Sequence, residues 1–217
     1  MSKRLIRWAV ANATISTVVF ALAGRWTDPW LWALGIAWAA TTLYAIVPVD
    51  DDLLQERFRP PDQGADAVAL RFIRILALAL FVVGALDSGR WHLAPVPSAL
   101  RAAAIAVMAA TFCIFFRAMH ENRFFSAVVR VQKERAHRVI ETGPYSVVRH
   151  PGYAGVLFGM PFAGLALGSW LAAAIGVVLS LLVVRRVLFE DAFLRRNLEG
   201  YSEYATRVRQ RLVPRLW

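Results

Sequence analysis

Long apolar runs separated by short polar intervals dominate the chain. Four of them are long enough to cross a bilayer, because about 20 apolar residues in a helix span roughly 30 Å of hydrocarbon. They cover about residues 5–23, 29–47, 69–88 and 98–119. Two more runs, 153–167 and 170–187, follow a longer polar interval, and only Gly168 and Ser169 separate them. Spans this close must run antiparallel, so we predict a C-terminal helical hairpin and an all-α polytopic membrane protein with about six transmembrane helices.

Basic residues are distributed unevenly between the two sides of this predicted bundle. The chain contains 25 Lys+Arg and 15 Asp+Glu, a formal net charge of +10. Six spans place both termini on one side, and 22 of the 25 basic residues fall on that side, leaving Arg25, Arg90 and Arg101 on the other. Cytoplasmic loops carry an excess of Lys and Arg. We therefore expect an integral protein of the cytoplasmic (inner) membrane with both termini in the cytoplasm. Topology explains the basic surplus, and no nucleic-acid partner is expected.

The sequence divides into two predicted regions. Residues 1–119 form a membrane region of four spans, and residues 120–217 contain the hairpin and two polar segments. The segments 120–152 and 188–217 flank the hairpin on the same face, so we expect them to close over each other. The acidic interval 48–68 is interpreted as a solvated linker, and an acidic metal site there is the less favoured alternative.

Composition and missing motifs exclude several classes of protein. Apolar residues make up 58% of the chain and charged residues 18%, which is not the composition of an ordinary soluble enzyme. The sequence has no Gly-x-Ser-x-Gly elbow, His-Glu-x-x-His motif or phosphate-binding glycine loop. Its single cysteine, Cys113, and the spacing of its four histidines argue against a metal site. Polar residues are sparse within the spans, which argues against a transporter.

Polar residues suited to chemistry gather at the cytoplasmic ends of the predicted hairpin. Arg149 and His150 precede Pro151, which suits the first turn of a helix, and free N–H groups at such a helix start attract anionic groups. At the other end, Arg186 and Glu190 are four residues apart and share a helix face. In one interpretation these residues line one pocket. In the alternative, Arg186 pairs with Glu190 while Arg149 and His150 extend to lipid headgroups.

Short motifs over residues 137–214 resemble the isoprenylcysteine carboxyl methyltransferase superfamily, which includes phospholipid methyltransferases. The residues that carry the resemblance are His137-Arg138-Val139-Ile140, Gly143-Pro144-Tyr145, Arg149-His150-Pro151-Gly152-Tyr153, Gly155, Glu190-Asp191, Leu194, Tyr201, Tyr204 and Pro214. The sequence departs from the family where a Glu-Glu pair is usual, because it has Glu190 and Asp191. An amide is common near position 130, whereas this chain has Arg130 with Gln132 nearby.

This resemblance implies an integral membrane methyltransferase that uses S-adenosylmethionine, bound on the cytoplasmic side. The implied methyl acceptor is a lipophilic molecule from the bilayer, and membrane lipids are the other expected partners. The resemblance implies that Arg186 faces the acceptor, so we assign it the catalytic role of orienting that acceptor, with Arg149 as a second substrate-binding residue. The implied cofactor-binding residues are His137, Arg138, Val139, Ile140, Tyr145, His150, Pro151, Gly152, Tyr153 and Glu190.

Methyl transfer from a sulfonium requires positioning and exclusion of water, but no metal and no covalent nucleophile. A carboxylate acceptor is already ionised at neutral pH, and the planar guanidinium of an arginine matches its two oxygens. The favoured hypothesis is therefore O-methylation of a lipophilic carboxylate. N-methylation of a phospholipid headgroup is the alternative, and a non-enzymatic protein that binds anionic lipid is a less favoured one.

Overall fold

A computed structural model of the chain describes residues 3–60 and 64–217, and these residues form helices and loops with no strand among them. The principal helices are α1 (Lys3–Ala23), α2 (Pro29–Ile46), α3 (Asp51–Phe58), α4 (Ala67–Leu86), α5 (Ser98–Glu121), α6 (Pro151–Leu167), α7 (Trp170–Asn197) and α8 (Tyr201–Arg207). A π-helical turn, Asp87–Trp91, extends α4, and 3₁₀ turns form at Lys133–Arg135 and Gly143–Ser146. The all-α prediction is confirmed.

Five of the described helices are long and apolar enough to cross a membrane. They are α1, α2, α4 with its π-helical extension, α5 and α7. The remaining predicted span, 153–167, corresponds to α6, which is apolar but has only 17 residues, or about 26 Å of helix. The prediction of a polytopic membrane protein is therefore confirmed, with α6 as the shortest of six apolar helices in the described chain.

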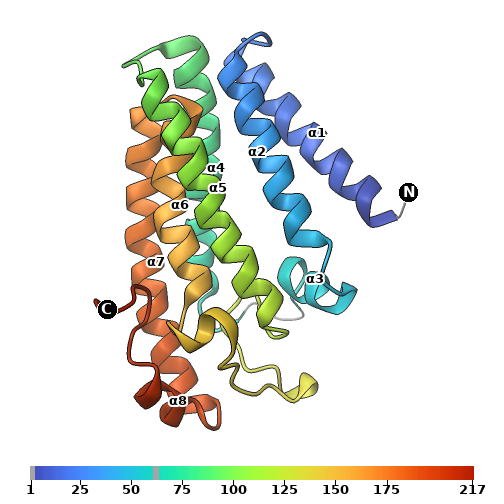
Figure 1. Cartoon of the computed structure of the whole chain (residues 1–217), viewed down its shortest axis with the longest axis vertical. Coiled ribbons are helices and arrows are strands. Elements are labelled where there is room, and N and C mark those ends of the chain that lie inside the picture. The colour runs from blue at the N-terminus through green and yellow to red at the C-terminus, as the bar shows by residue number, and fades with distance from the viewer. Residues whose placement is uncertain (1–2, 61–63) are drawn as a thin grey trace.

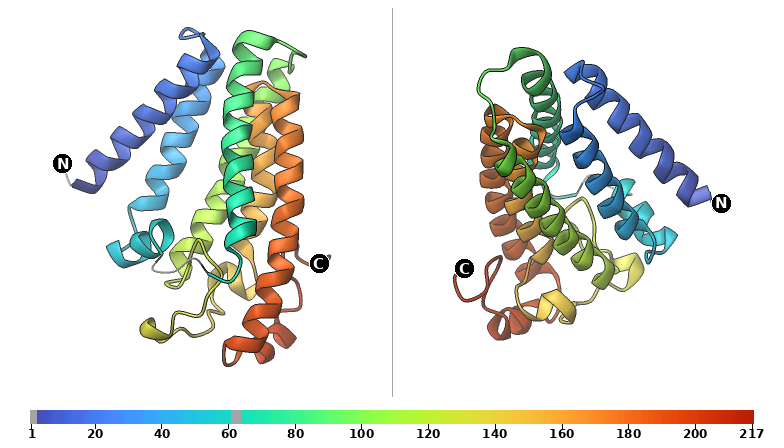
Figure 2. Two further views of the ribbon diagram at one scale, coloured as in Figure 1. Left: turned by 180° about the vertical axis from the view of Figure 1, so that it is seen from behind. Right: turned by 45° about the horizontal axis from the view of Figure 1, so that its top comes forward.

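Helices α4, α5, α6 and α7 form a bundle, and the α1–α2 pair lies beside it (Figure 1). In the bundle, α6 packs against α5 and α7, and α7 packs against α4, while α2 contacts α5. The views in Figure 2 show α1 and α2 diverging from the bundle toward the end that carries α3. The main core, which includes Leu80, Met108 and Leu167, holds α4, α5 and the α6–α7 turn together.

Small residues allow the two helices of the C-terminal hairpin to pack closely. A Cβ atom at Gly164 would lie 2.2 Å from the main-chain nitrogen of Ala173, and one at Gly176 would lie 2.5 Å from the carbonyl oxygen of Met160. Such close backbone approach favours helix association in membranes. The predicted hairpin is confirmed, and α7 continues beyond the predicted residue 187 to Asn197.

Pro161 lies within α6 and interrupts its hydrogen bonding. Proline has no N–H, so the carbonyl of Leu157, four residues earlier, loses its helical partner. The hydroxyl of Ser180, on α7, donates to this carbonyl oxygen at 2.7 Å. The neighbouring helix thus satisfies a backbone acceptor that would otherwise be exposed to the apolar interior.

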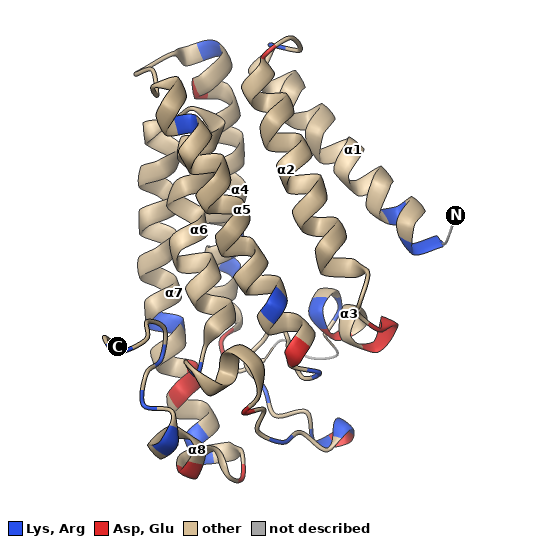
Figure 3. Cartoon of the chain, in the orientation of Figure 1, with Lys and Arg blue, Asp and Glu red and all other residues tan. Residues whose placement is uncertain are grey.

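Charged side chains gather at the end of the bundle that carries α3 and α8, which we call the charged end (Figure 3). At the opposite end, Arg25 and Arg101 lie 3.9 and 3.8 Å from the carboxylate of Asp28. Arg90, also at that end, donates to the carbonyl of Leu22 at 2.6 Å. This separation of charge agrees with the pattern seen in the sequence, while the cytoplasmic position of the termini stays a prediction.

Candidate functional site

A cavity of about 190 Å³ lies at the charged end, among α3–α7 and the loop that joins α5 to α6. All the sequence-predicted site residues except Pro151 line it. These are His137, Arg138, Val139, Ile140, Tyr145, Arg149, His150, Gly152, Tyr153, Arg186 and Glu190. Pro151 is buried in the first turn of α6, directly behind this wall. The fold therefore brings the predicted residues together around one space.

Arg186 and Glu190 lie one turn apart on α7, and each has its own polar partners. The hydroxyl of Tyr153 donates to Glu190 Oε2 at 2.6 Å. Arg186 Nη2 donates to the carbonyl of Ala127 at 2.6 Å, and Arg186 Nε lies 3.1 Å from Asp66 Oδ2. The alternative of an ion pair between Arg186 and Glu190 is wrong, because among the described residues these two side chains bind other groups. Glu190 remains half-buried beside the cavity.

The interpretation of the acidic interval between α2 and α4 as a solvated linker is wrong for Glu56 and Asp66, while residues 50–52 are exposed. Glu56 and Asp66 are only 5% and 8% exposed, although residues 61–63 lie outside the described part of the chain. Arg130 binds Glu56 through Nε at 3.1 Å and Nη2 at 2.7 Å. Burial raises the pKa of Glu56, but hydrogen bonds from Arg130 and Ser126 outweigh it and hold that pKa below its usual value. This interval therefore supports the loop that forms one wall of the cavity.

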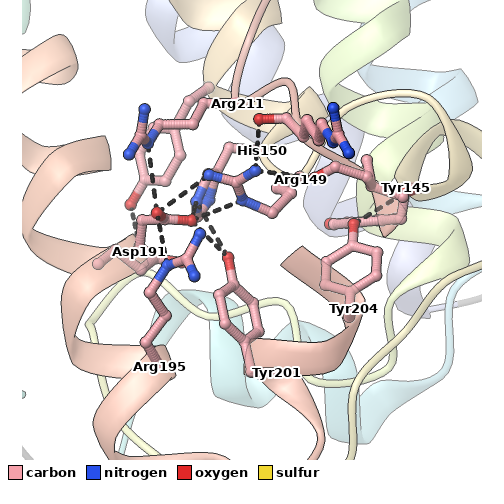
Figure 4. A network of polar contacts seen from close by, with 12 residues as sticks. Tyr145, Arg149, His150, Asp191, Arg195, Tyr201, Tyr204 and Arg211 are labelled. Atoms are coloured by element: carbon pink, nitrogen blue, oxygen red, sulfur yellow. Dashed lines mark hydrogen bonds and ion pairs between the residues drawn. The ribbon is translucent and has the colours of Figure 1, made fainter. Parts of the chain in front are cut away.

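Asp191 is the centre of a buried polar network at the start of α6 (Figure 4). Arg149 donates through Nε and Nη2 to its two oxygens at 2.7 and 3.0 Å, in the forked geometry that matches a carboxylate. The Tyr201 hydroxyl donates to the same carboxylate at 3.0 Å. Arg149 and His150 are 4% and 5% exposed. The alternative in which these two side chains extend to lipid headgroups is therefore wrong.

The segment that follows α8 is bound directly to the start of α6. Arg149 Nη1 donates to the carbonyls of residues 208–209 at 2.8 and 2.7 Å. The main-chain N–H groups of Arg149 and His150 donate to the carbonyls of residues 210–211, each at 2.9 Å. The predicted closure of the two polar segments over each other is confirmed. We call this contact the tail clasp.

The loop between α5 and α6 is organised around Gln132, which is fully buried. Its side-chain amide donates to the carbonyl of Phe124 at 2.7 Å, and its main-chain N–H donates to His137 Nδ1 at 3.2 Å. The His137 ring stacks on Phe124 with 4.4 Å between centroids. Burial, followed by the charges of Arg130 and Arg135, lowers the pKa of His137 to about 4. The ring is therefore neutral at physiological pH and lines the cavity as an uncharged aromatic group.

Four tyrosines give the cavity an aromatic wall: Tyr145, Tyr153, Tyr201 and Tyr204. The Tyr204 hydroxyl donates to the carbonyl of Tyr145 at 2.7 Å, and the Asn122 amide donates to the Tyr145 hydroxyl at 3.3 Å. Burial raises the pKa of Tyr145 and Tyr201, so both remain uncharged. Uncharged aromatic faces beside a carboxylate form an environment that favours a cationic ligand group.

Most of the chain segments that form the cavity match a known protein family. Residues 102–196, from α5 through most of α7, match the Isoprenylcysteine carboxyl methyltransferase (ICMT) family. The chain is ICMT-like in this region. The match includes the loop between α5 and α6 and the α6–α7 hairpin, which supply most of the cavity wall. The resemblance that the sequence motifs indicated is thereby confirmed.

Similarity to individual curated proteins supports the family match. A probable protein-S-isoprenylcysteine O-methyltransferase of Oryza sativa subsp. indica is 35% identical over 89 residues, 40% of this chain and 47% of the relative. Protein-S-isoprenylcysteine O-methyltransferase B of Arabidopsis thaliana is 30% identical over 89 residues, 40% of this chain and 45% of the relative. The match thus spans just under half of the length of these relatives.

Sequence reasoning missed the part of the wall that precedes the ICMT-like region in the chain. Arg57 of α3, with Leu70 and Ile73 of α4, also lines the cavity. One signal was available in the sequence. Arg57 follows Leu53 and Leu54 by four and three residues, which places it on the apolar face of a helix. A cation on the apolar face of a helix indicates a structural partner or a functional role.

Proposed function

We propose that this chain is an integral membrane methyltransferase that transfers the methyl group of S-adenosylmethionine to the carboxylate of a lipophilic acceptor. The observation that carries the proposal is the meeting of Glu190, Tyr153 and Arg186 at one cavity in the ICMT-like region. The rice and Arabidopsis relatives support it, because both are named as O-methyltransferases of protein S-isoprenylcysteine. An S-isoprenylcysteine carboxylate is accordingly the first acceptor to test.

The side chains of the cavity fit the chemical groups of S-adenosylmethionine. Glu190 accepts one hydrogen bond from Tyr153, and a carboxylate has further lone pairs for an ammonium or ribose hydroxyls. The rings of Tyr145 and Tyr153 suit a sulfonium cation. Neutral His137 and the apolar side chains of residues 139–140 line the cavity where an adenine ring can pack. When bound, the cofactor supplies the electrophilic methyl group.

Arg186 is the residue that we propose to orient the acceptor carboxylate. It is only 5% exposed and is held by Ala127 and Asp66, so little side-chain entropy remains to be lost when a ligand binds. An ionised carboxylate needs no general base, and a fixed guanidinium aligns one of its oxygens with the methyl group. Because Asp66 balances the charge of Arg186, this residue contributes orientation more than net positive charge.

Arg149, also predicted to bind substrate, is largely occupied within the protein. Four of its five N–H groups donate to Asp191 and to the carbonyls of residues 208–209. At most one N–H is left for the acceptor. We therefore propose that Arg149 mainly holds the tail clasp in place and that Arg186 makes the acceptor contact.

Cofactor binding to the purified protein in detergent tests the first half of the proposal. Glu190→Gln removes a charge-assisted hydrogen bond of about 1.5–3 kcal/mol, so affinity measured by calorimetry should fall about ten- to a hundred-fold. His150→Ala should also weaken binding. Unchanged affinity in both variants would contradict the proposed cofactor position.

Activity with a matched pair of lipids, one acid and one amine, tests the second half. Arg186→Ala should abolish methylation of the acid while cofactor binding is retained, and Arg186→Lys should restore little, because lysine lacks the planar fork. Arg185→Ala is the matched control, since Arg185 is the exposed neighbour on α7. If the wild type methylates only the amine, a phospholipid N-methyltransferase replaces this proposal.

A further inference from the structure

Arg57 packs against two phenylalanine rings and lines the cavity. Its guanidinium carbon is 5.3 Å from the ring centre of Phe115 and 5.5 Å from that of Phe125. The two rings meet edge to face, with 5.3 Å between their centres. Phe125 is itself wedged against Gly152, where a Cβ atom would lie 2.8 Å from the ring. The packing therefore fixes where the positive charge of Arg57 is presented.

Arg57 has no carboxylate partner among the residues described, 3–60 and 64–217, and unlike Arg138, which is exposed to solvent, it is half-buried. Three other arginines that line the cavity each have a carboxylate partner. The pairs are Arg130–Glu56 at 2.7 Å, Arg149–Asp191 at 2.7 Å and Arg186–Asp66 at 3.1 Å. Burial lowers the pKa of Arg57 to about 10, with nearby Arg186 contributing in the same direction. The group still remains charged at neutral pH.

A charge taken from water without a counter-charge is costly for a folded protein. Aromatic faces compensate only part of that cost, by about 0.5–2 kcal/mol. Each of the three paired arginines has a carboxylate close enough to compensate its charge, whereas Arg57 contributes a positive charge that a ligand anion would balance. The apolar side chains of Leu70 and Ile73 line the same cavity and suit a hydrocarbon chain.

We propose, building on the function proposed above, that Arg57 binds a carboxylate in the cavity beside Arg186. The methyl acceptor is the source of this carboxylate that the surroundings favour, since apolar residues of α4 and α5 line the same cavity as Arg57. In this arrangement Arg186 orients the acceptor, and Arg57 supplies the uncompensated charge that selects an acid. A residue outside the ICMT-like region thereby determines substrate class. The amino-acid carboxylate of the cofactor offers the same chemistry, and the experiment separates the two sources.

Binding measured without turnover provides the test. The wild type, Arg57→Gln and Arg57→Lys are loaded with S-adenosylhomocysteine and titrated with N-acetyl-S-farnesylcysteine, farnesoic acid and oleic acid. Each acid is paired with its own neutral carboxamide. Separate titrations compare S-adenosylhomocysteine with 5′-methylthioadenosine, which lacks the amino-acid carboxylate. Arg59→Gln is the matched control, because Arg59 is exposed just after α3.

We expect the wild type to prefer at least one acid over its amide. In Arg57→Gln, affinity for that acid should fall on the order of ten- to a hundred-fold, with amide and nucleoside affinities unchanged. The affinity of Arg57→Lys for that acid should lie between those of the wild type and Arg57→Gln, and the affinity of Arg59→Gln should match that of the wild type. No acid preference in the wild type, or an unchanged preference in Arg57→Gln, overturns the proposal. Loss of S-adenosylhomocysteine binding alone would assign Arg57 to the cofactor instead. If the wild type binds neither nucleoside, the proposed function itself fails.

Discussion

Two neighbouring carboxylates on α7 illustrate how position decides the role of a residue. Asp191 is 2% exposed and accepts from Arg149 and Tyr201. Glu190 is half-buried and accepts from Tyr153 beside the cavity. The helix turns about 100° between them, so one faces the start of α6 and the other the cavity. Asp191 is therefore a structural group, and Glu190 is the one available to a ligand.

This contrast predicts opposite effects of two similar substitutions. Asp191→Asn leaves Arg149 buried without its counter-charge, and breaking a buried pair in this way costs about 3–5 kcal/mol. We expect a marked loss of thermal stability in detergent. Glu190→Gln should change stability little. Glu203→Gln, an exposed carboxylate on α8, controls for loss of charge alone. Equal melting temperatures for Asp191→Asn and Glu203→Gln would refute the structural role.

A pH dependence follows from His137, whose pKa is lowered to about 4. The unfolded chain binds this proton near pH 6.5, whereas burial of the ring and the nearby charges of Arg130 and Arg135 disfavour its protonation in the folded loop. Stability from this group is therefore complete above about pH 6.5 and is lost as the pH falls toward 4. Histidine NMR should show this ring titrating near 4, and His137→Gln should lose less stability across the window. A ring that titrates near 6.5 would contradict the burial of His137 beside Arg130 and Arg135.

The helices show which parts of the fold sequence reasoning can reach. The lengths of two apolar runs predicted the hairpin, and Pro151 predicted the start of α6. Both features could be predicted because their signals lie within a few neighbouring residues. The buried roles of Glu56 and Asp66 could not be found in this way. Their partners, Arg130 and Arg186, are far away in the sequence, and a carboxylate in a polar segment gives no sign of a distant cation. Positions at the ends of the hairpin pointed to Arg149, His150, Arg186 and Glu190, but the other predicted cavity residues of the ICMT-like region were accessible only through motif order, since no single spacing specifies the site.

Close packing between α6 and α7 gives a prediction for a single methyl group. Gly176→Ala places a Cβ atom 2.5 Å from the Met160 carbonyl oxygen. Because main-chain atoms of a packed helix are displaced only at a cost in free energy, this contact is destabilising. We expect a loss of about 1–3 kcal/mol, visible as a lower melting temperature. Gly35→Ala is the control, because its Cβ would meet only the Ser16 hydroxyl at 3.6 Å, an ordinary contact. Equal stability of the two variants would show that the hairpin relaxes more easily than the packing suggests.

The uneven distribution of charged residues between the two ends of the molecule predicts a membrane topology that can be measured. The cavity and most charged residues share one end of the bundle (Figure 3), and the positive-inside rule assigns that end to the cytoplasm. Reporter fusions at Asp28, Trp91 and Gly168 should therefore read as outside. Fusions at Gln132 and after the last residue should read as inside. An outside signal at Gln132 would place the cavity away from cytoplasmic S-adenosylmethionine and would be inconsistent with the proposed reaction.

The tail clasp has a consequence for biosynthesis. Residues 208–211 bind Arg149 and His150, yet the ribosome makes them after helices α1 to α7. Chains fold progressively as they emerge, so the bundle inserts while the start of α6 still lacks its partners. During translation, the buried charge of Arg149 depends on Asp191 until residue 208 arrives. Nascent chains arrested before that point should be membrane-embedded but unable to retain the proposed cofactor, so the capacity to bind it would arise only after the bundle has inserted.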